Sequence, residues 1–346
     1  MLNNKNILVT GGTGTIGTGL IEYILRNYNP KVIRILSRDE TKQNILKKTL
    51  ETFRNKLRFF IGDIRDKERL YRAMKDVDIV FHLAALKHVV ACEYNPFEAV
   101  KTNVIGLQNL IDVSIENNIE KFVFTSSDKA ATPCNTMGVT KLLGEKLVTT
   151  ANYYKGRAET IFYSVRLGNV LGSRGSLIPL VKKQIKKNLP ITLTHKEMTR
   201  YIMDIDMAIN LILRTLNLAQ GGEVFVLKMK AVKVFDLIRV LIKNLANEQG
   251  KDLDNIEIKE IGMFAGEKLY EELFSIEEAE RTYEIDDMYI ISPQITEISK
   301  KLDIDKYPNI NKFDTSKPFN SQEENYLSEE EIREFLINNN IINSID

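Results

Sequence analysis

The stretch Asn6-Ile7-Leu8-Val9-Thr10-Gly11-Gly12-Thr13-Gly14-Thr15-Ile16-Gly17 decides the fold class of this 346-residue chain. Its first five residues have the largely apolar, β-branched character of a buried strand, and a helical pattern follows from residue 17 to residue 28. Gly11, Gly14 and Gly17 are three residues apart, a spacing typical of turns that bring the backbone close to a pyrophosphate at a helix N-terminus. The stretch therefore predicts a dinucleotide site that also includes Thr13, Thr15 and Ile16, although an ordinary tight turn has the same pattern.

Short β-rich runs alternate with helical patterns through the first half of the chain. Further strands are predicted at residues 32–36, 57–61, 79–82, 122–125 and 160–166, and helices at residues 41–50, 67–75, 96–116 and 140–154. This alternation predicts an α/β fold, a doubly wound parallel sheet of the Rossmann type with helices on both faces.

After about Gly172 the alternation loosens, and a smaller lobe is expected. Helices are predicted at residues 178–187 and 234–247, and residues 191–193 and 223–227 are predicted to pair as strands. Ser328 and Glu331 have the spacing of a capping box that opens a final helix. We assign residues 1–172 to a dinucleotide-binding domain, with some later segments returning to it. Residues 173–346 are expected to form mainly a substrate-binding lobe and a C-terminal tail.

Composition argues against several classes of partner. Lys and Arg number 48 against 47 Asp and Glu, so no overall field favours nucleic acid or an anionic membrane. The three histidines lack ligand-like spacing with the two cysteines, so no metal site is expected. The N-terminus leads straight into a strand, and the longest apolar stretch is far shorter than the ~20 residues of a membrane helix. We expect a cytoplasmic protein without a membrane span.

The corner after the second strand bears on the choice of dinucleotide. Ser37 and Arg38 stand where an acid commonly binds an unphosphorylated ribose, and the planar fork of arginine suits a 2′-phosphate, which favours NADP. Lys42 lies one helical turn away as a second cation. Asp63, beside Ile64 after the third strand, is placed to accept from an adenine amine. After the fourth strand, the small residues Ala84 and Ala85 let the chain pass close to the dinucleotide.

The chemical centre is expected where the next strand ends. Ser127, Asp128 and Lys129 fall at the carboxyl edge of the sheet, where ligands of α/β proteins bind. Met137 and Lys141 lie four residues apart at a helix start and therefore on one face. Lys141 can bind a nicotinamide ribose and add positive charge, whereas the Met137 thioether cannot accept a hydroxyl proton. A salt-bridged loop pair and simple core filling are the alternatives.

Together these motifs resemble the extended short-chain dehydrogenases/reductases, in the branch of UDP-N-acetylglucosamine 4,6-dehydratases and capsular polysaccharide biosynthesis proteins. The resemblance covers nearly the whole chain, including residues 9–14, 37–40, 84–89, 93–96, 101–103, 127–130, 166–176, 198–200 and 266–269. Members commonly have tyrosine where this chain has Met137. Those with methionine include both C5-inverting capsule enzymes and C5-retaining, membrane-anchored relatives. The Ser37-Arg38 corner is more similar to that of the NADP-using, inverting enzymes.

The resemblance implies a sequence of proton and hydride transfers. Hydride leaves sugar C4 and returns at C6, Lys129 removes the C5 proton, and Asp128 protonates the departing C6 hydroxyl. We expect burial and the Lys141 charge to lower the pKa of Lys129 against the effect of Asp128, and Asp128 to need a raised pKa. Ser127 or an ordered water would take the C4 hydroxyl proton, because Met137 cannot.

The resemblance also implies where a sugar nucleotide binds. Asn169 and the loop Ser173-Arg174-Gly175-Ser176 resemble the segment that follows the diphosphate, and Arg200 resembles a uridine or phosphate contact. Lys87 is a further candidate for substrate contact, and Glu267 is assigned with the second lobe.

The expected activity is that of an NADP-dependent, C5-inverting UDP-N-acetylglucosamine 4,6-dehydratase, which makes a UDP-2-acetamido-2,6-dideoxy-4-hexulose for surface glycans. The alternatives are a C5-retaining dehydratase, a sugar-nucleotide 4-epimerase or reductase, and a non-enzymatic NADP sensor. The resemblance also implies a homo-oligomer, from dimer to hexamer.

Overall fold

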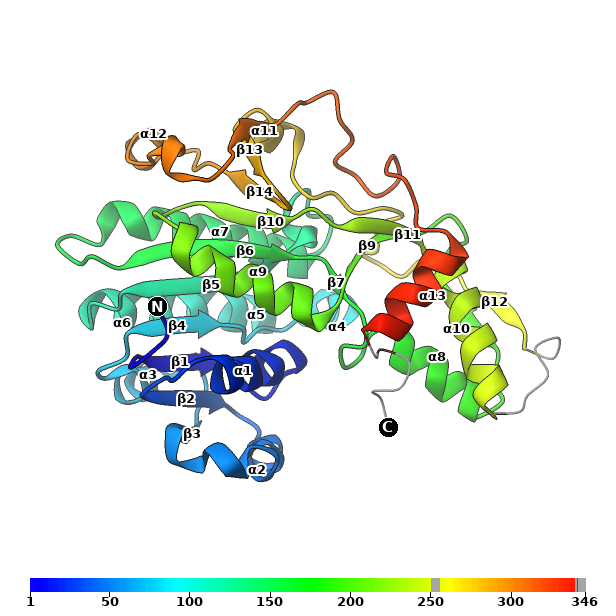
Figure 1. The fold of residues 1–346 in the computed structure, drawn as a ribbon, viewed down its shortest axis with the longest axis horizontal. Coiled ribbons are helices and arrows are strands. Elements are labelled where there is room, and N and C mark those ends of the chain that lie inside the picture. The colour runs from blue at the N-terminus through cyan, green and yellow to red at the C-terminus, as the bar shows by residue number, and fades with distance from the viewer. Residues whose placement is uncertain (250–255, 340, 342–346) are drawn as a thin grey trace.

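A computed structural model describes residues 1–249, 256–339 and 341 (Figure 1). Within these residues one ten-stranded sheet dominates the molecule. Its strands are β1 (Asn6–Thr10), β2 (Val32–Ser37), β3 (Leu57–Ile61), β4 (Ile79–His82), β5 (Lys121–Ser127), β6 (Ile161–Leu167), β10 (Val224–Leu227), β13 (Thr282–Ile285), β14 (Met288–Ile291) and β15 (Asn311–Lys312).

The strand order across this sheet is β15-β13-β14-β10-β6-β5-β4-β1-β2-β3. Neighbours from β3 to β10 run parallel, whereas β14, β13 and β15 pair antiparallel beyond β10. The order 3-2-1-4-5-6 is that of a doubly wound dinucleotide-binding sheet. The predicted fold class is therefore confirmed, and β1, β3 and β4 begin and end at the predicted residues.

Helices cover both faces of the sheet, as the alternation of side chains along β1 demonstrates. Ile7 and Val9 pack with one layer that includes α1 and α9, whereas Leu8 between them packs with the opposite layer that includes α3, α6 and α7. The helices of this part are α1 (Thr15–Asn27), α2 (Glu40–Thr49), α3 (Lys67–Met74), α4 (Val89–Tyr94), α5 (Pro96–Ala99), α6 (Gly106–Glu116), α7 (Thr136–Tyr154), α9 (Ile205–Leu218), α11 (Ile276–Ala279) and α12 (Thr296–Ser299).

Short helical turns complete this part of the chain: η1 (Glu51–Lys56), η3 (Asp128–Ala130) and η5 (Ile304–Lys306) are 3₁₀ turns, and η2 (Val100–Ile105) is a π-helical turn. The helix predicted over residues 96–116 thus consists of α5, η2 and α6 in succession. The Asn103 side chain in η2 binds both the N–H and the carbonyl of Leu86, at 2.8 and 3.0 Å, and fixes the loop after β4. A π-helical turn beside a functional loop is a common arrangement.

A smaller lobe lies at one end of the sheet, as Figure 1 shows in green, yellow and red. Its apolar core joins α8 (Leu177–Lys186), α10 (Val234–Gln249) and α13 (Glu329–Asn338), and β8 (Ile191–Leu193) pairs there with β12 (Ile258–Glu260). A three-stranded sheet of β7 (Asn169–Val170), β9 (Thr199–Met203) and β11 (Lys230–Lys233) lies next to it. The predicted capping box is present, since Ser328 Oγ accepts from the Glu331 N–H at 3.3 Å and the Glu331 carboxylate accepts from the Ser328 N–H at 2.8 Å.

One predicted pairing is wrong. Residues 191–193 pair with β12, whereas residues 224–227 form β10, which lies between β6 and β14 in the main sheet. All four residues of β10 are buried, so this strand needs cover on both faces, which only the main sheet provides. In the part of the chain that is described, no helix is long and apolar enough to cross a bilayer.

Candidate active site

A cavity of about 770 Å³ opens at the carboxyl ends of the parallel strands. Ligands of open α/β sheets bind at this edge. Its wall is formed by Gly11, Thr13, Gly14, Thr15, Ile16, Gly17, Leu36, Ser37, Arg38, Asp39, Lys42, Gly62, Asp63, Ile64, Leu83, Ala84, Ala85, Leu86, Lys87, His88, Thr102, Thr125, Ser126, Ser127, Lys129, Met137, Lys141, Leu167, Gly168, Asn169, Val170, Ser173, Arg174, Gly175 and Ser176. The structure thus brings together most of the residues that the sequence assigns to cofactor and substrate.

The glycine turn packs so closely against the neighbouring backbone that it leaves no room for a Cβ at Gly11 or Gly17. A Cβ on Gly17 would lie 2.6 Å from the Gly11 carbonyl oxygen, and a Cβ on Gly11, which has φ +67°, would lie 2.7 Å from the Ala84 nitrogen. Gly14 precedes α1 without a side-chain cap, so the first N–H groups of this helix face the turn without a competing side chain. A backbone cradle at a helix N-terminus fits a dinucleotide pyrophosphate.

The corner after β2 is rich in cations. Arg38 and Lys42 both line the cavity, and an Arg38 nitrogen lies 3.7 Å from the Asp63 carboxylate. Asp39, which the sequence analysis did not assign, is occupied locally because its carboxylate caps α2 through the Lys42 N–H and pairs with the Lys42 ammonium, each at 2.9 Å. Ser37 Oγ accepts from the Gln43 side chain at 3.0 Å. Asp39 and Asp63 are the only acidic residues among the described residues that line the cavity.

Ser127 and Asp128 form a short hydrogen-bonded relay at the end of β5. Ser127 Oγ lines the cavity and donates to Asp128 Oδ1 at 2.7 Å. The same oxygen accepts from the Lys129 backbone N–H at 2.8 Å and from its ammonium at 3.1 Å, while Asn169 donates to Oδ2 at 3.4 Å. Asp128 is only 2 % exposed. The 3₁₀ turn η3, which follows the strand directly, gives the two side chains this arrangement.

Lys129 lies between two carboxylates. Its ammonium is 3.1 Å from Asp128 Oδ1 and 3.1 Å from Oε1 of Glu271, a buried residue that the sequence analysis did not assign. Burial lowers the pKa of Lys129, but the charges of Asp128 and Glu271 outweigh burial and the Arg200 charge, so the pKa is raised overall. The expectation of a lowered pKa is therefore wrong, because the charges of Asp128 and Glu271 together outweigh burial.

Met137 and Lys141 lie one turn apart on α7, as their spacing predicted. Met137 is 3 % exposed and belongs to a small apolar cluster with Cys92 and Ala99. The Lys141 ammonium donates to the Thr125 carbonyl at 2.8 Å. Burial lowers the pKa of Lys141 to about 8, although the nearby Glu145 and Cys92 oppose this shift. Residue 137 thus supplies packing, whereas Lys141 supplies a cation that titrates near neutrality.

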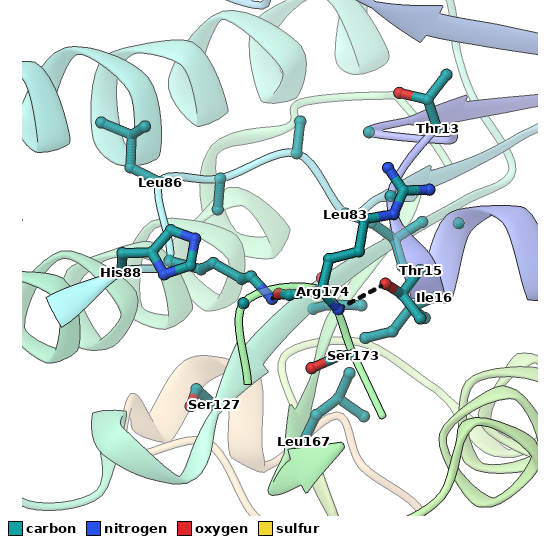
Figure 2. Close-up of a pocket in the computed structure, with 18 of the residues that line it drawn as sticks. Thr13, Thr15, Ile16, Leu83, Leu86, His88, Ser127, Leu167, Ser173 and Arg174 are labelled. Atoms are coloured by element: carbon teal, nitrogen blue, oxygen red, sulfur yellow. Dashed lines mark hydrogen bonds between the residues drawn. The ribbon is translucent and has the colours of Figure 1, made fainter. Parts of the chain in front are cut away.

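The loop from Ser173 to Ser176 closes over the glycine turn (Figure 2). The Arg174 N–H donates to Thr15 Oγ1 at 3.2 Å, and its carbonyl accepts from the Lys87 ammonium at 2.9 Å. Gly175 has φ +74°, and a Cβ there would lie 2.7 Å from the His88 ring. Burial and the Arg174 charge lower the pKa of Lys87. The loop therefore places two cationic side chains at the cavity, beside the cradle.

Three assigned residues, Asp128, Arg200 and Glu267, are not among the described residues that line the cavity. Asp128 contacts Ser127 and Lys129, which do line it. The Arg200 guanidinium donates to the backbone carbonyls of residues 199, 268 and 269 and lies 3.7 Å from Glu271. The Glu267 carboxylate accepts from the Phe264 N–H at 2.9 Å. Both side chains order the segment that carries Glu271, and their contacts with a sugar nucleotide stay predictions.

Metal ligation finds no support in the geometry. Thr10 Oγ1 lies 2.7 Å from His82 Nδ1, and burial together with the Lys141 charge lowers the pKa of His82 to about 3, so this ring is a neutral packed group. No group of three or more His, Cys, Asp and Glu side chains suited to a metal ion occurs among the residues that the structure describes.

Glu271 and Ser126, like Asp39, are residues of the site that sequence reasoning missed. Ser126 Oγ is buried at the cavity without a hydrogen-bond partner in the described part of the chain. The sequence analysis assigned its neighbour Ser127 instead, because Ser127 begins the run Ser127-Asp128-Lys129. Glu271 follows the Gly266–Leu269 motif by two residues, and no local pattern separates it from Glu267 and Glu272. Only the tertiary fold brings it to Lys129.

Fold and cavity together define a nucleotide-binding protein of the Rossmann class. The chain belongs to the polysaccharide biosynthesis protein family, whose sequence pattern matches residues 7–293. It is 44 % identical to the UDP-N-acetylglucosamine 4,6-dehydratase (inverting) of Campylobacter jejuni over 306 residues, which cover 88 % of this chain and 87 % of that protein.

Two further relatives bear on the site. The UDP-glucose 4-epimerase of Rickettsia bellii is 38 % identical over 343 residues, 98 % of this chain and 97 % of that one. The crystal structure of Pen from Bacillus thuringiensis superimposes with a TM-score of 0.89 and 42 % identity, and the match covers 97 % of this chain and 98 % of that one. The overall architecture is thus that of an experimentally observed relative.

Proposed function

We propose that this protein is a UDP-N-acetylglucosamine 4,6-dehydratase that inverts C5 and releases a UDP-2-acetamido-2,6-dideoxy-4-hexulose for surface glycan synthesis. One observation carries the proposal: Ser127 and Lys129, which line the cavity, are joined by hydrogen bonds through the buried Asp128, and Met137 lines the same cavity where the resemblance implies a tyrosine base. Identity to the inverting dehydratase of Campylobacter jejuni supports the same assignment.

The cofactor that we assign is NADP. The glycine cradle would hold its pyrophosphate, Arg38 and Lys42 its 2′-phosphate, Asp63 its adenine and Lys141 its nicotinamide ribose. When bound, the nicotinamide supplies reversible hydride transfer, from sugar C4 and back to C6. The Arg38 side chain at this corner of the cavity supports NADP over NAD, because its planar fork suits a 2′-phosphate. Fluorescence titration with NADPH and NADH tests the choice, and tighter binding of NADH would contradict it.

The chain's own residues move the protons. Ser127 Oγ takes the proton of the C4 hydroxyl while its own proton passes to Asp128 Oδ1 across the 2.7 Å hydrogen bond. The Lys141 cation stabilises the negative charge that develops on the C4 oxygen. Lys129, as the neutral amine, then removes the C5 proton, and Asp128 gives its proton to the C6 hydroxyl, which leaves as water. Reprotonation of C5 from the face opposite Lys129 inverts that centre.

Residues on the facing wall would hold the UDP-sugar. Lys87 and Arg174 provide positive charge for a diphosphate, and Asn169 already contacts Asp128 through its amide. Ser176 Oγ is buried at this wall without a hydrogen-bond partner among the described residues, so a ligand oxygen would satisfy it. Ser173 and Gly175 complete the loop.

A 4-epimerase is the second candidate, because the Rickettsia relative bears that name. Epimerisation needs a base at the C4 hydroxyl but has no use for an amine at C5. Lys129 between two carboxylates therefore favours elimination over epimerisation. A non-enzymatic sensor has no need for this arrangement at all.

Proton NMR of the reaction in deuterated water tests the proposal. Purified protein with UDP-N-acetylglucosamine and no added coenzyme is expected to give a 6-deoxy-4-keto product with deuterium at C5 and the inverted configuration. A product that keeps its 6-hydroxyl with C4 inverted would establish the epimerase instead. A 6-deoxy product of retained configuration would identify the retaining dehydratase, and unchanged substrate would leave the sensor.

We also propose a homo-oligomer, from dimer to hexamer. Exposed apolar side chains occur on α4, α5, η2 and α7, which contact one another, and large exposed apolar patches mark interaction surfaces. These side chains are Val90, Tyr94, Phe97, Ile105, Val139 and Leu143. Light scattering tests this, and a monomer at assay concentration would overturn it. The cytoplasmic location stays a prediction.

A further inference from the structure

Glu271 is a buried carboxylate with one oxygen on Lys129. The residue is 2 % exposed, and Oε1 lies 3.1 Å from the Lys129 ammonium and 3.7 Å from the Arg200 guanidinium. Oε2 is buried and has no hydrogen-bond partner among the described residues. An unpaired oxygen of a buried carboxylate is unfavourable, since it has lost water without gaining a donor.

The backbone of Glu271 is fixed on both sides. Its N–H donates to Ser321 Oγ at 2.9 Å, and its carbonyl accepts from the Ser321 N–H at 2.8 Å. Ser321 Oγ in turn lies 2.9 Å from Thr199 Oγ1 at the start of β9. These contacts hold the backbone of residue 271 in place. Within the part of the chain that is described, the one charged contact of its carboxylate outside its own lobe is Lys129, 142 residues away in sequence.

We propose, on the basis of the dehydratase function above, that Glu271 is a positioning residue that takes a proton from Lys129 once C4 has been oxidised, so that Lys129 becomes a base only at that stage. The transfer is from the Lys129 Nζ ammonium to Glu271 Oε1 over 3.1 Å, and it leaves a neutral amine beside a neutral carboxylic acid. No proton enters or leaves the site in this step.

Oxidation at C4 is what triggers the transfer. In the resting protein Asp128 and Glu271 both hold the Lys129 charge, and their effect exceeds that of burial and Arg200. When Asp128 receives the C4 hydroxyl proton through Ser127, one of the two carboxylates becomes neutral. The Lys129 ammonium then faces burial and the Arg200 cation with Glu271 alone, in a cavity from which the sugar nucleotide excludes water. Under these conditions a neutral pair competes with an ion pair.

The remaining proton movements follow from this state. The neutral Lys129 amine takes the C5 proton, and Asp128 loses its proton with the departing water. Asp128 is then a carboxylate again, Lys129 is an ammonium, and Glu271 still carries one proton. Glu271 releases that proton to solvent, and C5 takes one proton from solvent on the face opposite Lys129, so protons balance and the resting charges of Asp128, Lys129 and Glu271 are restored. Deprotonation of Lys129 after C4 oxidation matches the base to its substrate, because the C5 proton becomes acidic only once C4 is a ketone.

The test separates hydride transfer from C5 proton removal. Glu271→Gln keeps the shape but cannot accept the proton, and Glu272→Gln is the matched control, since Glu272 is the next residue and pairs with Lys268 at 2.9 Å instead of Lys129. Rapid-mixing absorbance of the reduced nicotinamide reports C4 oxidation, and NMR reports deuterium incorporation at C5. In Glu271→Gln, we expect oxidation within about threefold of wild type and C5 exchange slower by about 100-fold. Glu272→Gln should leave both rates unchanged.

The pH dependence distinguishes the proposed role from a merely structural one. Without Glu271 the Lys129 proton must pass to solvent base, so C5 exchange in Glu271→Gln should rise with pH while C4 oxidation does not follow it. A damaged lobe would slow both steps together and would not respond in this way. If Glu271→Gln does not fold, Glu271→Asp keeps a carboxyl group but withdraws it from Lys129, so its C5 exchange should fall by a larger factor than its C4 oxidation.

Two results overturn the proposal and leave the dehydratase assignment intact: C5 exchange in Glu271→Gln equal to or faster than wild type, or C4 oxidation and C5 exchange reduced by the same factor at every pH. Failure of the proposed function is a different observation, because then wild-type protein itself would form no 4-keto product from UDP-N-acetylglucosamine.

Discussion

Two buried charge clusters lie at the main sheet and differ in how completely their charged groups are paired. In the closed cluster, Arg166 on β6 is fully buried and binds Glu145 and Glu278 through four hydrogen bonds of 2.7–2.8 Å. A fifth, at 3.1 Å, goes to the Leu273 carbonyl. In the open cluster, Lys129 contacts Asp128 and Glu271 at 3.1 Å each, lines the cavity, and leaves Glu271 Oε2 unpaired in the described structure.

The difference separates a structural from a chemical use of the same residue types. Arginine stays charged under all conditions, and a carboxylate pair that satisfies its planar fork fixes the position of α7 and α11 relative to β6. Lysine can lose its proton, and unsatisfied acceptors around it leave room for a second charge state. Perturbed and incompletely paired groups in a cleft are typical of functional sites.

The largest effect is expected from Lys129→Met, which removes the only group in the open cluster that can take the C5 proton. We expect turnover to fall by about 10⁴-fold, because general base catalysis contributes up to that factor. C4 oxidation in a single turnover should fall much less. Residual turnover close to wild type, measured by NMR, would assign the base elsewhere and remove the distinction between the two clusters.

A substitution in the closed cluster should lower the free energy of unfolding instead of the rate of a chemical step. Arg166→Met leaves Glu145 and Glu278 without their common partner, and breaking a buried ion pair costs about 3–5 kcal/mol of unfolding free energy. Urea unfolding measures the loss. The triple replacement of Arg166, Glu145 and Glu278 by apolar residues is the control, and it should recover much of that stability. Unchanged stability in Arg166→Met would mean that this cluster is not structural.

Lys141 interacts with residues near both clusters, and the pH dependence of C4 oxidation tests its role. It contacts the Thr125 carbonyl near the open cluster, and Glu145 of the closed cluster raises its pKa against the larger effect of burial. With a pKa of about 8, it is charged below that pH and neutral above it. In the proposed mechanism its cation stabilises the C4 oxygen, so C4 oxidation should fall as pH rises above about 8, by up to tenfold per unit.

Lys141→Arg is the control for this pH dependence, since a guanidinium stays charged throughout the range. Its C4 oxidation should lose the decline above pH 8, whatever its absolute rate. A decline that persists unchanged in Lys141→Arg would assign the titration to another group.

The sequence predicted the consecutive residues of the open cluster but not the residues that the tertiary fold brings to them. Ser127, Asp128 and Lys129 are consecutive, so a strand end and a short turn suffice to place them, and the strand pattern was readable from the buried apolar runs. The glycine turn and the Arg38 corner were found for the same reason. Glu271 and the pairing of β10 depend on contacts over more than a hundred residues or between strands of separate segments, and no residue beside them carries that information.

The smallest effect is expected at Met137, the position at which the resemblance implies a tyrosine. Its side chain packs with Cys92 and Ala99, and in the proposed mechanism the Ser127–Asp128 hydrogen bond provides a route for the C4 proton. Met137→Tyr should therefore change C4 oxidation by no more than about threefold, whereas Ser127→Ala should reduce it by about 100-fold. Combining the two tests whether a phenol can replace the relay, and partial recovery over Ser127→Ala is expected. A large gain in Met137→Tyr alone, at unchanged substrate affinity, would mean that the open cluster lacks an efficient acceptor at C4, and that its charges serve only the later proton at C5.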